Sequence, residues 1–183
     1  LEPGNRWNPM IDAISTYING CELDQVSVKD FENYEDTEIN WRVPRGYGAL
    51  IAAYGAPCRV ALNCNVSLID HSGARIRIET SQGTLTADKA IVCVPTDLIA
   101  AEAIRFSPAL PDKVDAATNL PLGESHWSRD PFARGSYSHA LPGHADKRAV
   151  LAAPVNDRMF FAGEATSPDF FTTAHGAQQS GVR

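Results

Sequence analysis

The sequence has 183 residues, is 44% hydrophobic, and carries a formal net charge of −6 with a pI near 5.3. This length and composition suffice for one globular core. There is no basic stripe to suit nucleic acid or an anionic membrane, and no apolar run approaches the ~20 residues of a membrane span. We expect a cytoplasmic protein without nucleic-acid or membrane partners, although a chain that starts at Leu1 leaves a removed leader open.

The cysteines indicate a reduced protein. Cys21, Cys58, Cys64 and Cys93 are scattered without a CxxC pair. Cys93 lies in the apolar run 90–94, where a buried thiol behaves as a small hydrophobic side chain. Cys58 and Cys64 flank a short predicted strand and could be neighbours. We expect structural thiols rather than a disulfide or a metal site.

The amino-terminal part predicts two helices. Asn8 as N-cap and Pro9 at the first helical position open one helix, and Gly20 ends it. Its apolar stripe consists of Ile11, Ile14 and Ile18. Ser27 is typical of a second N-cap. The acidic stretch 30–40 then predicts a solvated surface, to which we assign no site.

A glycine loop at 45–48 and a short apolar helix at 49–54 precede a region with the pattern of β-structure, 59–94. Apolar residues alternate along it, with turns at 71–73 and 81–83. The alternating pairs are Val60 and Leu62, Val66 and Leu68, and Ile76 and Ile78. The run 89–94 is continuously apolar after its first residue and is followed by proline, which is typical of a parallel core strand covered on both faces.

The carboxy-terminal stretch predicts a strand, a loop and a helix. An apolar strand at 158–162 stops at Gly163, and Glu164 follows directly. Thr172 or Thr173 can cap the next helix, whose free amides suit an electron-rich group. An ordinary strand, loop and helix without a ligand is the alternative.

The residues Phe-Ala-Gly-Glu-Ala-Thr at 161–166, followed by Thr-Ala-His-Gly-Ala at 173–177, resemble the carboxy-terminal signature of the flavin-dependent amine oxidases, relatives of polyamine and monoamine oxidases. The resemblance implies an α/β fold (mixed α+β), with a β-meander and flanking helices around FAD. It also implies that Gly163 lies against FAD and that Glu164 binds a sugar-chain hydroxyl. Thr173 and Ala174 would face the pyrimidine edge of the flavin.

Two further positions follow from the resemblance. Val66 matches the residue whose backbone meets the FAD adenine, and Tyr137 matches an aromatic wall of the amine site. The second aromatic wall of monoamine oxidases would fall at Thr173, which favours the polyamine-oxidase-like branch. Ser136 occupies the position of a flavin-linked cysteine in some relatives, so the resemblance implies noncovalent FAD.

Parts of the family pattern are missing. No GxGxxG segment and no counterpart of the flavin-site lysine occur, and the long substrate-binding segment expected between Gly123 and Glu124 is absent. We therefore divide one discontinuous domain into residues 1–123, with helices and the β-meander, and residues 124–183, which contact the flavin. Relative to the family the chain is incomplete, and we expect the 183 residues alone to be inactive.

The resemblance implies oxidation of a small-molecule amine to an imine, with oxygen as electron acceptor and hydrogen peroxide as product. A homodimer is conceivable. Two alternatives stay open: a carotenoid-desaturase-like or protoporphyrinogen-oxidase-like flavoprotein, and a noncatalytic remnant or partner module. No metal is expected, because His139 and His144 lack a carboxylate or cysteine at matching spacing.

Overall fold

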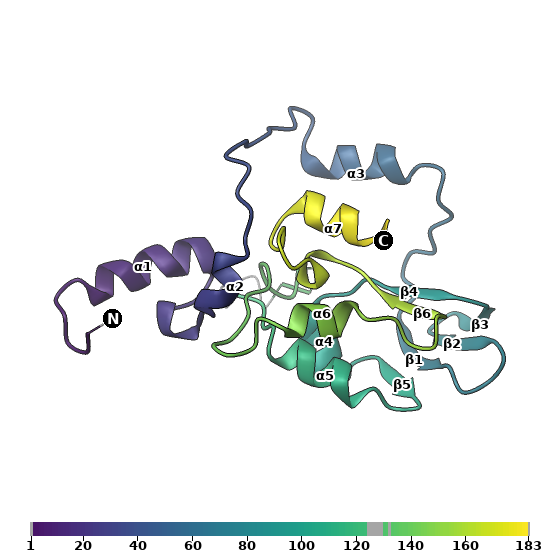
Figure 1. The fold of residues 1–183 in the computed structure, drawn as a ribbon. Helices are drawn as coiled ribbons and strands as arrows, with labels where there is room; N and C mark the ends of the chain where they lie inside the picture. Colours follow the sequence, from purple (N-terminus) through teal and green to yellow (C-terminus); the bar gives the residue numbers. More distant parts are fainter. Residues whose placement is uncertain (1, 124–129, 132, 183) are drawn as a thin grey trace.

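The computed structural model describes residues 2–123, 130–131 and 133–182 (Figure 1). The helices are α1 (Asn8–Asn19), η1 (Leu23–Gln25), α2 (Val28–Glu32), α3 (Tyr47–Gly55), α4 (Thr96–Ala100), α5 (Pro111–Thr118), α6 (Lys147–Ala152), η3 (Glu164–Thr166) and α7 (Ala174–Ser180). The strands are β1 (Val66–Asp70), β2 (Ile76–Thr80), β3 (Gly83–Ala87), β4 (Ala90–Val92), β5 (Arg105–Ser107) and β6 (Met159–Phe161). The predicted mixed α/β fold is confirmed.

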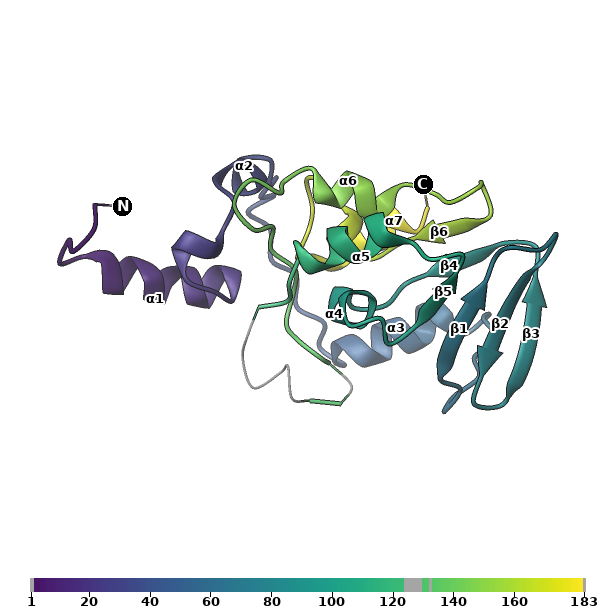
Figure 2. The same cartoon turned by 90° about the horizontal axis from the view of Figure 1, so that it is seen from below.

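The larger sheet contains the predicted meander. Strands β1, β2 and β3 pair antiparallel, and β5 lies parallel to β1, which gives the order β3-β2-β1-β5 (Figure 2). The prediction of a strand at Val60 and Leu62 is wrong. These side chains are 71% and 75% exposed, and the first strand begins only at Val66. Alternation alone cannot form a strand where the chain meets no partner backbone.

The second sheet joins residues far apart in the sequence. Strands β4 and β6 pair in parallel, with Val92 opposite Phe161. The predicted parallel strand is thus confirmed, but its two faces are not both covered, because Ile91 is 63% exposed. The prediction of a buried Cys93 is also wrong. Its side chain is exposed, just beyond the end of β4.

Helices α4, α5 and α6 pack together beside the sheets (Figure 2) and enclose the core. Its larger members are Ile69, Ile76, Val92, Ile99, Ile104, Leu120, Leu151, Met159 and Phe161. A charged side chain crosses this region. Lys113 of α5 is 5% exposed, and its Nζ donates to the backbone oxygens of Val150 (2.6 Å), Leu151 (2.9 Å) and Ala153. Lys113 therefore caps the carboxyl end of α6, where backbone oxygens lack partners within the helix.

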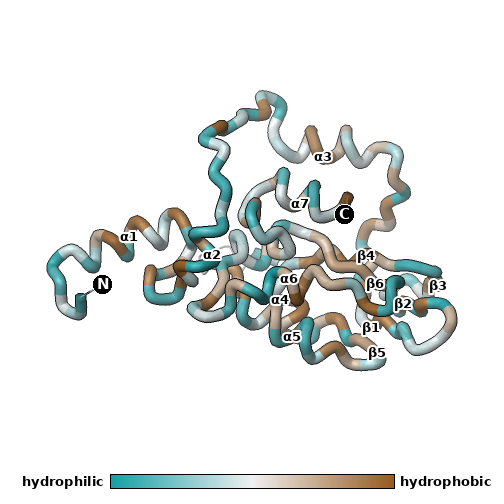
Figure 3. Tube along the Cα trace, viewed as in Figure 1, coloured by the Kyte–Doolittle hydropathy of each residue, from teal (hydrophilic) through white to brown (hydrophobic). Residues whose placement is uncertain are grey.

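Helix α1 projects from the rest of the chain in both views (Figures 1 and 2). Pro9 lies in its first turn and Gly20 ends it at φ 77°, as predicted, but Trp7 rather than Asn8 is its N-cap. Figure 3 shows apolar residues along α1 and α3. The exposed apolar residues at these two helices are Trp7, Met10, Ile14, Tyr17, Ile18, Tyr47, Leu50, Ile51 and Tyr54.

Within the described part of the chain, no helix has the length and apolar character to span a bilayer.

Candidate functional site

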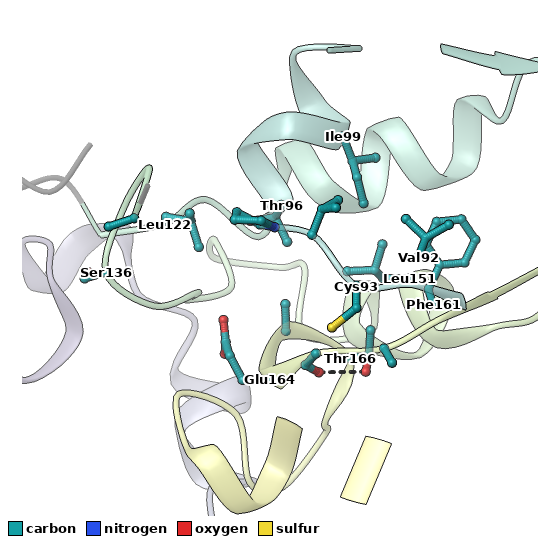
Figure 4. Close-up of a pocket in the computed structure, with 16 residues that line it drawn as sticks. Val92, Cys93, Thr96, Ile99, Leu122, Ser136, Leu151, Phe161, Glu164 and Thr166 are labelled. Carbon is teal, nitrogen blue, oxygen red and sulfur yellow. Dashed lines mark hydrogen bonds between the residues drawn. The ribbon is translucent and has the colours of Figure 1, made fainter. Parts of the chain in front are cut away.

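A cavity of about 240 Å³ opens at the carboxyl ends of β4 and β6 (Figure 4). In open parallel sheets this edge is the usual place for a ligand. Its lining includes Cys93, Thr96, Leu122, Ser136, Gly163 and Glu164. Figure 4 shows the Cys93 sulfur and the Glu164 carboxylate on the same side of this cavity.

Gly163 gives the cavity an accessible stretch of backbone. It adopts φ 131°, which favours glycine, and a Cβ built there would meet only Cys93 Sγ, at 3.9 Å. The position is nevertheless firmly held. The Gly163 N–H donates to Ser180 Oγ at 2.9 Å, and its carbonyl accepts from Thr166 Oγ1 at 2.8 Å (Figure 4). A flat ligand can therefore approach this backbone closely without displacing a side chain.

The Cys93 thiol lies beside Gly163. Desolvation by the surrounding residues raises the pKa of Cys93 above its usual value. The side chain therefore remains a neutral thiol at neutral pH, which makes it a poor nucleophile.

Three protein donors hold the Glu164 carboxylate. Its Oε1 accepts from Ser138 N at 3.0 Å, and its Oε2 accepts from Ser138 Oγ at 2.9 Å and from Thr172 N at 2.8 Å. A carboxylate offers about four acceptor positions, so Glu164 retains capacity for one further donor. Glu164 thus links the Ser138 segment to the loop before α7 while facing the cavity.

Behind Glu164 lies a buried ion pair that the sequence analysis missed. Arg148 Nε and Nη2 donate to the two carboxylate oxygens of Asp30, each at 2.8 Å, and the side chains are 1% and 3% exposed. The guanidinium also lies 3.8 Å from the ring centroid of Phe171. The prediction that the acidic stretch from Asp30 is solvated is therefore wrong at its first residue. The partners are 118 positions apart, and no local pattern reveals such a pair.

Tyr137 lies outside the lining of the Gly163 cavity, at a smaller cavity of about 10 Å³ that Thr172 also lines. Its hydroxyl donates to the Ile18 carbonyl at 2.6 Å, and the Tyr17 carbonyl is 3.3 Å away. Burial raises the pKa of Tyr137, and the neighbouring Cys21 and Tyr17 raise it further. In this structure the hydroxyl holds the carboxyl end of α1.

Tyr137→Phe is therefore expected to lower the free energy of unfolding by about 0.5–1.5 kcal/mol, because one hydrogen bond to a helix end is lost. Urea denaturation of the purified chain measures this. Tyr54→Phe is the matched control, since Tyr54 is 71% exposed on α3, and it should behave as wild type. Equal stability of all three proteins would show that the hydroxyl contact contributes nothing.

The other predicted site residues occupy separate places. Thr173 caps α7 as predicted, its Oγ1 accepting from Gly176 N at 3.0 Å, and Ala174 is exposed in the first turn. Both follow Thr172, whose amide reaches Glu164. Val66 begins β1 in the other sheet, opposite Thr80. The structure thus brings Gly163 and Glu164 into one cavity and connects the start of α7 to it, while Val66 and Tyr137 lie elsewhere.

Two predictions concern other parts of the chain. The direct junction of Gly123 with Glu124 lies partly outside the described residues. His139 is 6% exposed, and burial and the nearby Arg148 charge lower its pKa, so its ring is neutral at pH 7. In the ranges 2–123, 130–131 and 133–182, no group of three or more His, Cys, Asp or Glu side chains has the arrangement of a metal site.

Comparisons with known proteins agree with this fold. A solved structure of cyclohexylamine oxidase from Brevibacterium oxydans IH-35A aligns with a TM-score of 0.59 and 16% identity, over 72% of this chain and 49% of that one. Lysine-specific histone demethylase 1 homolog 2 of Oryza sativa subsp. japonica is 48% identical over 60 residues, 32% of this chain and 8% of that protein. Polyamine oxidase 4 of the same subspecies is 45% identical over 74 residues, 40% of this chain and 14% of that protein.

The chain therefore spans about half of the aligned solved structure, and its matches cover far less of the curated relatives. The family model described as "Flavin containing amine oxidoreductase" matches residues 2–125 and 122–183. Because these two ranges cover nearly the whole sequence, the chain belongs to the flavin-containing amine oxidoreductase family.

Proposed function

We propose that this chain forms part of the FAD site of an enzyme that oxidises a small-molecule amine to an imine, with oxygen as electron acceptor and hydrogen peroxide as product. The observation that carries the proposal is the cavity at the end of β6, where the exposed backbone of Gly163 and the carboxylate of Glu164 lie together. The name of one relative by sequence, a polyamine oxidase, supports an amine substrate.

The residues present fit the ring and sugar parts of FAD. Gly163 leaves room for a flat group, and Glu164 can accept one more hydrogen bond from a sugar hydroxyl. The sequence contains no GxGxxG, so the residues that would bind the pyrophosphate in that manner are not in this chain. Ser136, at the cavity in place of the cysteine that links flavin in some relatives, supports noncovalent binding.

When bound, FAD would supply a hydride acceptor for the amine carbon and a route for two electrons, with two protons, to oxygen to give hydrogen peroxide. The part of this chain's own residues would be to bind and orient the cofactor. Gly163 would set the distance of closest approach of the cofactor, Glu164 would hold its sugar chain, and Leu122 and Ile99 keep the cavity wall apolar. We further propose a cytoplasmic location, which the four free cysteines support.

Glu164→Gln is expected to weaken FAD binding about ten- to hundredfold while changing amine affinity much less. The substitution removes a charge-assisted hydrogen bond to the cofactor and places an amide N–H₂ against the donors that the carboxylate now accepts from. Quenching of flavin fluorescence during titration measures the affinity. Glu102→Gln, an exposed carboxylate change, is the control. Unchanged affinity in Glu164→Gln would remove Glu164 from the proposed site.

The 183-residue chain supplied with FAD is expected to release no peroxide from mono-, di- or polyamines. Catalysis of this kind depends on holding the substrate carbon in contact with the cofactor in a dry, shaped slot. The segment that the family uses to build that slot has no counterpart in this sequence. Steady peroxide release with any amine would show that residues of this chain build the slot without it.

A noncatalytic module, acting as a partner subunit or a homodimer, is the second candidate. The exposed apolar side chains of α1 and α3 favour it, because such surfaces are usually covered by further polypeptide. Sedimentation equilibrium with added FAD separates the candidates. A colourless, self-associating chain supports the module, and a chain that retains yellow flavin supports the FAD site.

A further inference from the structure

The contacts of Arg148 reach beyond its ion pair with Asp30. While Nε and Nη2 grip the carboxylate of Asp30, Nη1 donates to Ser138 Oγ at 2.9 Å. Ser138 is fully buried at 0% exposure, and the same Oγ lies 2.9 Å from Glu164 Oε2. One hydroxyl therefore connects the buried ion pair to the carboxylate at the cavity.

The chemistry of these groups fixes the direction of the connection. A guanidinium has five N–H donors and no acceptor, and a serine hydroxyl has one proton. Ser138 Oγ must therefore accept from Arg148, which leaves its own proton for Glu164 Oε2. Charge-assisted hydrogen bonds of this kind are shorter and stronger than neutral ones. Arg148 thus orients and polarises the hydroxyl that donates to Glu164.

The backbone on the other side of Glu164 is strained. Thr172 adopts φ 64°, a left-handed conformation that a β-branched residue rarely takes. In this conformation its N–H donates to Glu164 Oε2 at 2.8 Å. Strained residues persist where surrounding contacts fix them. The hydrogen bond to Glu164 is one such contact, so the conformation of Thr172 depends on the position of the Glu164 carboxylate.

We propose that Arg148, held by Asp30, is a positioning residue that fixes the Glu164 carboxylate at the cavity through the hydroxyl of Ser138. The link couples the amino-terminal helix α2, which contains Asp30, to the edge of the cavity. Its importance for cofactor binding rests on the proposed function. The positioning itself does not, because every contact in it lies within the protein.

Amide hydrogen exchange in the 183-residue chain, followed by NMR without cofactor, tests the positioning. The reporter is the Thr172 amide, which Glu164 holds. The reference is the His71 amide, which donates to Ser107 O of β5 at 2.7 Å, in the larger sheet. In Ser138→Ala, which loses the hydroxyl bond to Glu164, and in Arg148→Lys, which loses the bond that orients this hydroxyl, the Thr172 amide is expected to exchange about five- to tenfold faster, while the His71 amide is unchanged.

Ser15→Ala is the matched control. Ser15 is also buried, at 4% exposure, and its hydroxyl accepts from Asn19 Nδ2 at 3.1 Å, without contact with Glu164. Neither amide should respond to that change. Should Arg148→Lys fail to fold, Asp30→Glu, which keeps both charges but displaces the guanidinium, replaces it, with the same expectation.

Equal acceleration of both amides would mean that the link only stabilises the whole chain, and no acceleration at Thr172 would mean that it does not hold Glu164. A response to Ser138→Ala but not to Arg148→Lys would assign the role to Ser138 alone. Each of these results overturns the proposal. A separate FAD titration of the same variants distinguishes the two ideas, because failure to bind FAD would contradict the proposed function and leave the exchange result intact.

Discussion

Arg148→Met is expected to lower the free energy of unfolding by about 3–5 kcal/mol. The change leaves the carboxylate of Asp30 buried without its cation, and an uncompensated buried charge is among the most costly defects in a protein. Asp30 is only 2% exposed, so water cannot replace the lost partner. Methionine still fills the volume over the ring of Phe171, which restricts the loss largely to the charge and its hydrogen bonds. Urea denaturation measures the difference.

Two variants make this result specific. Lys147→Met removes the neighbouring cation of α6, whose pair with Asp115 is exposed, and should leave stability nearly unchanged. The double variant Asp30→Leu/Arg148→Met removes both charges and should lose less stability than Arg148→Met alone. If Arg148→Met were as stable as Lys147→Met, the buried ion pair would contribute little to the stability of the chain.

Lys113→Met is expected to lower the free energy of unfolding by about 2–4 kcal/mol. Three backbone oxygens at the end of α6 lose their donor, and that of Leu151 is in a fully buried hydrogen bond. Burial lowers the pKa of Lys113 to about 8, so the ammonium is still the main form at pH 7 and its hydrogen bonds are charge-assisted. The thermal unfolding midpoint should fall accordingly.

Lys89→Met is the matched control for Lys113. The Lys89 ammonium lies 5.5 Å from the ring centroid of Phe160, as that of Lys113 lies 4.6 Å from Phe161, but Lys89 is exposed. Lys89→Met should therefore unfold almost as wild type. A similar loss in both variants would mean that the ring contact, rather than the capping of α6, explains the effect.

Local signals predicted much of the fold. Gly20 ends α1, Ser27 and Thr173 cap their helices, and β6 stops before Gly163, because each feature depends on residues within a few positions of one another. The strand expected at Val60 and the burial expected of Ile91 failed for the opposite reason. A strand requires a partner and a buried face requires a cover, and neither is encoded in the segment itself.

In the candidate site, too, the features encoded by neighbouring residues were predicted and those that depend on distant residues were not. Gly163 and Glu164 were predicted together because they are adjacent, and the structure places both at one cavity. The contacts that hold Glu164 come from Ser138 and Thr172, and the charge behind them comes from Arg148 and Asp30. These contacts depend on how β6, α6 and α2 pack, which no local pattern specifies. The Glu164 carboxylate, which we propose as a cofactor ligand, therefore also holds separate segments of the fold together.

The most direct test of the flavin site is a map of amide chemical shifts as FAD is added to the wild-type chain at millimolar concentration. We expect saturable shifts centred on Gly163 and Glu164 and on the facing residues Cys93 and Thr96, with the amides of α1 unaffected. Saturable shifts centred elsewhere, or none at these four residues, would contradict the assignment of this cavity to the cofactor.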